Sequence, residues 1–128
     1  MRSVEETLRL FGLTYTQYNG LRILAGAGEG GLPCGEIGAR MITRDPDMTR
    51  LLDRMEKSGL VRRGRGEKDR RVVRVYLTAE GAEALRGLEK PVRDAIRAPL
   101  AALGTPKLEQ LIGLLEEIRI QIEDGAST

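Results

Sequence analysis

Two strand patterns follow directly on a strongly marked helix in the middle of this sequence, and this order restricts the folds open to the chain. The runs at 60–65 and 72–77 are rich in Val, Leu and Tyr and are bounded by glycines and charges, as short strands are. The residues that join them, 66–71, are mostly charged. The simplest connection is therefore a β-hairpin whose tip projects into solvent, within a mainly α-helical protein.

The helix before the hairpin has clear start and stop signals. Asp45 can cap it, Pro46 suits its first position, and Asp47 favours its positive end. Gly59 is a natural stop. The helix then turns three apolar side chains inward (Leu51, Leu52 and Met55) and four charged ones outward (Arg50, Asp53, Arg54 and Lys57).

Three shorter helices are predicted before it. Residues 3–12 form an amphipathic pattern with Val4, Leu8 and Phe11 on one stripe. Thr14 and Gln17 have capping-box spacing, so a second helix is expected to start near Tyr15. A third covers 36–41, so that a helix-turn-helix leads into the hairpin.

Two helices are predicted after the hairpin. Thr78 caps the first, and Pro91 is expected to kink or restart it. Thr105-Pro106 repeats the start signal for the second, which has a heptad-like apolar seam (Leu108, Leu111, Leu115, Ile118 and Ile122). The seam can be an ordinary core face, but a dimer interface is the preferred interpretation because a terminal helix of this kind needs something to cover it.

Composition argues against an enzyme. The chain has 128 residues, no histidine and one cysteine, which excludes imidazole bases, disulfides within the chain and most zinc sites. We therefore expect no metal and no cofactor. No apolar run approaches a membrane span, and acids near the start do not fit a signal peptide, so a cytoplasmic protein without membrane contact is expected. We expect Cys34 to be a half-buried structural thiol rather than an oxidant sensor.

Charge is concentrated in one segment. Residues 40–74 carry twelve basic and six acidic side chains, a net charge of +6, whereas the rest of the chain carries −4. A basic middle segment suggests a face that meets a polyanion, although a solvated arginine-rich surface would look the same.

The predicted helix-turn-helix gives the charge a geometry. The second helix of such a unit lies in the DNA major groove, where an arginine can bind guanine through two hydrogen bonds. Arg50 and Arg54 share one helix face. The β-hairpin would be the wing of such a unit, and its arginines could enter the minor groove. The alternative is an exposed helix whose arginines form ion pairs with neighbouring acids (Asp47, Asp53 or Glu56).

The sequence resembles the MarR family of bacterial transcription regulators. Residues 49–62, TRLLDRMEKSGLVR, are similar to that family's recognition helix and following strand. The run 69–78 fits its D-x-R…L-T wing pattern, and Thr78-Ala79-Glu80-Gly81 is similar to the helix start that follows. The resemblance covers roughly residues 14–90.

The resemblance implies a winged helix-turn-helix homodimer that binds a pseudo-palindromic operator in double-stranded DNA and represses transcription. Members of the family are often released from DNA by a small-molecule effector. It implies a DNA-binding lobe at 14–78, a dimerisation region at 1–13 and 79–124, and a flexible tail at 125–128. Asp47 stands where the family often has a small hydroxyl residue. The residues expected at DNA are Arg44, Asp47, Thr49, Arg50, Arg54, Lys68, Asp69, Arg70 and Arg71.

One alternative remains from another class of function. A winged helix can also serve as a protein–protein interaction module without operator binding, because a fold does not settle a function.

Overall fold

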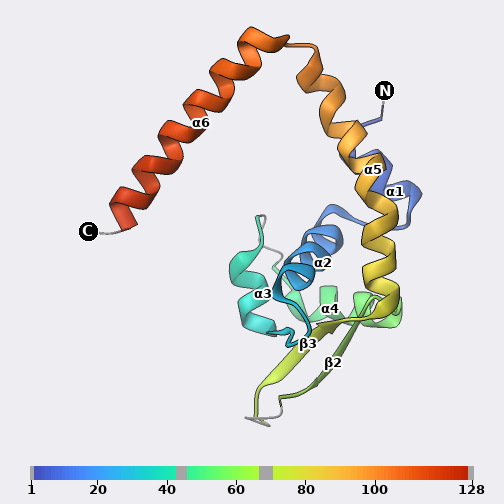
Figure 1. The fold of residues 1–128 in the computed structure, drawn as a ribbon. Coiled ribbons are helices and arrows are strands. Elements are labelled where there is room, and N and C mark those ends of the chain that lie inside the picture. Colours follow the sequence, from blue (N-terminus) through green and yellow to red (C-terminus); the bar gives the residue numbers. More distant parts are fainter. Residues whose placement is uncertain (1, 43–45, 67–70, 127–128) are drawn as a thin grey trace.

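The computed structural model describes residues 2–42, 46–66 and 71–126, and the chain is mainly helical with one small sheet at one end of the molecule (Figure 1). The elements in chain order are α1 (Val4–Leu10), α2 (Tyr15–Ala27), β1 (Leu32–Pro33), α3 (Cys34–Arg40), α4 (Met48–Lys57), β2 (Val61–Arg65), β3 (Val73–Leu77), α5 (Ala79–Ala101) and α6 (Thr105–Ala126). The predicted fold class, a winged helix-turn-helix between terminal helices, is confirmed.

Two helix starts follow the predicted caps. The Thr14 hydroxyl accepts from the Gln17 N–H at 3.2 Å, and the Gln17 side chain accepts from the Thr14 N–H at 3.0 Å, which completes the capping box of α2. The Thr78 hydroxyl accepts from the Gly81 N–H at 2.9 Å and donates to the Gly59 carbonyl at 2.6 Å. Thr78 therefore starts α5 and ties it to the turn that ends α4.

The start of α4 differs from the prediction. The helix begins at Met48 and its N-cap is Asp47, whose Oδ1 accepts from the Arg50 N–H at 3.0 Å. Asp45, the expected cap, lies outside the described residues, and Pro46 precedes the cap instead of opening the helix. The N-cap side chain must accept from a backbone N–H two or three residues later, and Asp47 stands three residues before Arg50.

The sheet has three strands, in the order β1-β3-β2, where the sequence predicted two. β1 pairs with β3 antiparallel, with Leu32 opposite Val75. Gly31 makes this approach possible, because it has φ +63° and a Cβ there would lie 2.3 Å from the Val75 carbonyl oxygen. Two residues after a glycine run are too few to show a strand pattern.

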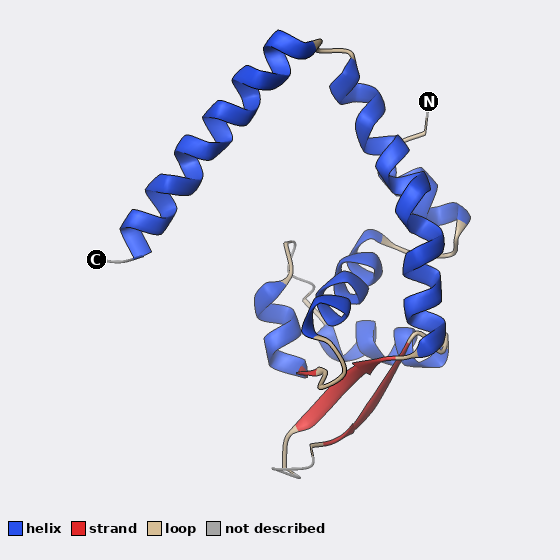
Figure 2. Cartoon of the chain, viewed as in Figure 1, coloured by secondary structure: helices blue, strands red, loops and turns tan. Residues whose placement is uncertain are grey.

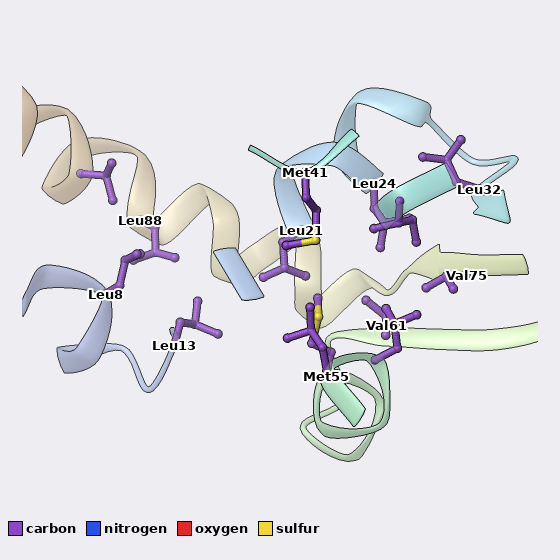
Figure 3. Close-up of a cluster of buried hydrophobic side chains, with 14 residues drawn as sticks. Leu8, Leu13, Leu21, Leu24, Leu32, Met41, Met55, Val61, Val75 and Leu88 are labelled. Carbon is purple, nitrogen blue, oxygen red and sulfur yellow. The ribbon is translucent and has the colours of Figure 1, made fainter. Parts of the chain in front are cut away.

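One apolar core joins the helices to the sheet (Figure 3). The three side chains of α4 predicted to face inward are all buried. Leu8 of α1 and Leu88 of α5 join the same core and are at most 1% exposed. Phe11 does not join it: α1 ends at Leu10, so Phe11 leaves the predicted stripe and is 51% exposed.

Of the two outcomes predicted for Pro91, a kink or a restart, the restart does not occur, because α5 runs through both Pro91 and Pro99. α6 continues through Ala126, two residues into the expected tail at 125–128, because Gly125 weakens a helix without stopping it.

α6 extends away from the other helices (Figure 2). None of its described side chains is buried. Its apolar side chains remain exposed, for example Leu115 at 55% and Ile122 at 66%. The seam predicted from the sequence is therefore present on α6 and is not covered within this chain.

Candidate nucleic-acid interface

The outer face of α4 is basic. Its inner face is fixed by the three buried apolar residues, so Arg50, Arg54 and Lys57, spaced four and three residues apart, lie together on the exposed side. Thr49 is exposed beside them. Within the described part of the chain, the Arg50 and Arg54 side chains form no ion pair or hydrogen bond.

The acids of α4 bind an arginine of the wing. Glu56 accepts from the Arg63 backbone N–H at 3.0 Å, from its Nε at 3.2 Å and from its Nη2 at 2.9 Å. The same Nη2 donates to Asp53 Oδ1. Asp53, which stands three residues after Arg50 and could have paired with it, therefore binds β2 instead.

These contacts change the protonation equilibria of the cluster. The hydrogen bonds from Arg63 lower the pKa of Glu56 below its ordinary value. The hydrogen bonds to Glu56 and Asp53 raise the pKa of Arg63. The cluster is therefore an ion-paired link between α4 and β2 at neutral pH.

The described wing arginines are used in different ways. Arg62 is exposed and lies over the Tyr76 ring, with its guanidinium carbon 4.2 Å from the ring centre. Arg74 donates to the carbonyl oxygens of Gly30 and Gly31, each at 3.1 Å. Arg63 and Arg74 thus hold the wing to the protein, whereas Arg65 and Arg71 are exposed on the hairpin.

The structure places five of the nine residues expected at DNA. Asp47, Thr49, Arg50 and Arg54 are exposed at or near the first turns of α4, and Arg71 is exposed just before β3. The other four lie outside the described residues (Arg44, Lys68, Asp69 and Arg70). Asp47 has a structural role as the cap of α4.

Arg63 was not singled out from the sequence, although a signal was available. Alternate residues of a strand share a face, so Arg63 lies on the same side of β2 as buried Val61. That side faces α4, whose acids are three residues apart on one face.

Other kinds of site find little support in the described residues. Cys34 is half-buried at the first position of α3, as predicted, and its structural role stays a prediction. No group of acidic or cysteine side chains in the described residues could hold a metal ion. No described helix combines the length and the apolar character that crossing a membrane requires.

These features define a winged helix-turn-helix protein, and comparisons with known proteins place it in a family. Residues 13–73 match the model of the MarR family. The chain is 32% identical to the homoprotocatechuate degradative operon repressor of Escherichia coli over 82% of its own length and 70% of that repressor. This chain belongs to the MarR family, a family of transcription regulators.

Two further relatives agree. The HTH-type transcriptional regulator TtmR of Methylorubrum extorquens is 35% identical over 91% of this chain and 56% of that protein. A MarR transcription factor of Planctomyces limnophilus has a solved structure with 40% identity and a TM-score of 0.68, over 88% of this chain and 82% of that one. The chain spans just over half the length of the first curated relatives it matches, 56% and 54%.

Proposed function

We propose that this protein is a dimeric transcriptional regulator that binds operator DNA through α4 and the wing. The observation that carries the proposal is the exposed pair Arg50 and Arg54, which have no protein partner in the described residues while the neighbouring acids bind Arg63. On the second helix of a helix-turn-helix, this pair meets base edges in the major groove. Arg71 and the rest of the hairpin tip would meet the backbone or the minor groove.

Repression is the proposed outcome of binding. One relative is named a repressor of an operon, and a protein that occupies promoter DNA prevents transcription from it. Such a protein acts from the cytoplasm and needs no enzymatic activity, metal or cofactor.

The proposed dimer uses the terminal helices. The exposed apolar side of α6 needs a partner surface, and a second copy supplies one. Two copies would present two recognition helices to successive major grooves, which lie about 34 Å apart. The chain then divides into a dimerisation region, 1–13 and 79–124, and a DNA-binding lobe, 14–78.

A hollow between α2 and α5 is the proposed effector site. It has a volume of about 590 Å³ and is lined by apolar side chains, three arginines and one acid (the lining includes Tyr18, Arg22, Ala25, Leu85, Arg86, Glu89, Val92 and Arg93). Glu89 pairs with Arg93. Arg86 pairs with Glu83, so Arg22 is the arginine left for a ligand. Such a surface suits a small molecule with an apolar body and an anionic group. Because α5 leads toward the dimer helices and α2 belongs to the lobe, a ligand here would bias the spacing of the recognition helices.

The test is a binding titration against DNA from the protein's own upstream intergenic region. Arg54→Ala is expected to weaken binding roughly 5- to 150-fold, the effect of losing one bidentate base contact. Arg9→Ala is the matched control, since Arg9 is an exposed arginine of α1 that pairs with Glu5, and it should change little. Affinity should also fall steeply with salt.

Two outcomes contradict the proposal. The first is operator affinity that ignores Arg50→Ala and Arg54→Ala together. The second is no binding of the unmodified protein to DNA at low salt, which would favour a protein partner for the basic face instead.

A further inference from the structure

Asp53 lies among the basic side chains of α4. It is three residues after Arg50, next to Arg54 and four residues before Lys57. Side chains three or four positions apart are neighbours on a helix, so Asp53 has Arg50 and Lys57 within reach on its own helix. Either pairing would engage a cation of the face proposed to bind DNA.

In the structure Asp53 binds Arg63 of β2 instead. The Arg63 Nη2 donates to both Asp53 Oδ1 and Glu56 Oε1. Glu56 fixes the position of this guanidinium, because it also accepts from the Arg63 Nε and backbone N–H. Glu56 itself has no basic residue three or four positions away on α4, so its part is to anchor Arg63.

Burial separates Arg63 from the arginines proposed to meet DNA. The Arg63 side chain is 27% exposed and lies on the protein side of β2, whereas Arg50 and Arg54 are exposed on the outer side of α4. Its Nε and Nη2 are both engaged by carboxylates. Arg63 is therefore poorly placed to be one more phosphate contact.

We propose that Arg63 is a positioning residue for the DNA-reading face. It holds the Asp53 carboxylate against the wing and so keeps Arg50 and Lys57 available for phosphates and base edges. The inference rests on the proposed DNA binding. It means that the hairpin also helps α4 to bind DNA, by holding Asp53, in addition to any contact that the hairpin itself makes with DNA.

The test is a double-mutant cycle between Arg63→Ala and Asp53→Asn, with operator affinity measured by fluorescence anisotropy at one salt concentration. Arg63→Ala alone should weaken binding at least about tenfold, because Asp53 is released toward Arg50 and Lys57. Asp53→Asn alone should stay within about twofold of the unmodified protein, since no carboxylate remains to be held. The double variant should bind as Asp53→Asn does.

Two results in the cycle overturn the inference. If Arg63 contacts phosphate directly, Arg63→Ala costs the same in the unmodified protein and in the Asp53→Asn background. If the pair only braces the hairpin, Asp53→Asn alone weakens binding as much as Arg63→Ala. Arg62→Ala is the matched control, because Arg62 is adjacent on β2 but lies over Tyr76, and its effect should add to that of Asp53→Asn without coupling.

A measurement without DNA separates this inference from the proposed function. A crystal structure of the Arg63→Ala variant should place the Asp53 carboxylate against Arg50 or Lys57, and thermal melting checks that the variant is folded. Asp53 pointing away from both overturns the inference, whatever the unmodified protein binds. If the unmodified protein fails to bind DNA, the proposed function fails, while this structure still decides whether Arg63 restrains Asp53.

Discussion

The winged lobe and the last helix handle their apolar residues in opposite ways. In the lobe, Leu21, Leu24, Ile37 and Val75 are at most 1% exposed. In α6, Ile112, Leu114 and Ile118 are more than half exposed. The lobe therefore completes its core within one chain, whereas α6 presents an apolar face that this chain leaves uncovered.

The difference shows where stability should depend on concentration. A single helix in water is marginal without tertiary packing, so α6 gains most of its stability from whatever covers it. The core of the lobe, which Leu8 of α1 and Leu88 of α5 complete, lies within one chain, so the lobe should unfold at the same temperature at any protein concentration. Substitutions in the two regions should separate these behaviours.

The largest effect is expected in α6. Leu115→Glu with Ile118→Glu puts two charges into the proposed dimer interface, and should raise the dissociation constant by roughly 100-fold or more because buried charges without partners are costly. Sedimentation equilibrium measures it. Gly113→Glu adds a charge on the side of α6 opposite the seam, where nothing lies within 4 Å of its Cβ position, and should leave the dimer intact. An unchanged dimer in the first variant would remove α6 from the interface.

The next largest effect is expected in the core of the lobe. Leu21→Ala removes a fully buried side chain and should lower the free energy of unfolding by about 2–5 kcal/mol. Chemical denaturation at two protein concentrations gives the value and its concentration dependence. A loss that vanishes at high concentration would show that the lobe also depends on its partner.

A smaller effect compares two glycines of α5. A Cβ at Gly81 would lie 2.2 Å from the Leu60 carbonyl oxygen, so Gly81→Ala should destabilise by about 1–3 kcal/mol. Gly87 has nothing within 4 Å of its Cβ position, so Gly87→Ala should stabilise by up to about 1 kcal/mol. Thermal melting of both variants shows whether each one raises or lowers the melting temperature. A change in the same direction for both would contradict the close contact between α5 and the turn after α4.

The smallest effect concerns pH. Because Arg63 lowers the pKa of Glu56, this carboxylate stabilises the folded state fully above its ordinary pKa of about 4.3, and the contribution is lost as pH falls through the lower folded value. As pH falls below about 4.3, the unmodified protein should therefore lose more stability than Glu56→Gln does. The side chain is 38% exposed, so solvent screening keeps the difference small. Parallel slopes for the two proteins would contradict the ion-paired link between α4 and β2.

Features with local signals could be predicted from the sequence. Thr14 with Gln17 marks the start of α2, Thr78 marks the start of α5, and the runs 60–65 and 72–77 mark β2 and β3. Each signal lies within a few residues of what it specifies, so one stretch of chain is enough to read it. The DNA-facing residues proposed on α4 follow from the same locality, because the buried apolar positions fix which side of the helix is exposed.

Features that depend on distant residues could not be predicted in this way. β1 is a strand only because Leu32 pairs with Val75, more than forty residues later. The role of Arg63 depends on the packing of α4 against β2. This packing decides whether Asp53 binds a cation of its own helix or Arg63 of the wing. Helix spacing alone allows both.

The junction between β1 and α3 has no spacer. Pro33 is the last residue of the strand and Cys34 is the first of the helix, so no loop separates the sheet from α3. Adding or deleting a single residue there would turn α3 by about 100° about its axis and move Ile37 out of the core. This junction should therefore accept changes in residue type across related chains but hold its length constant.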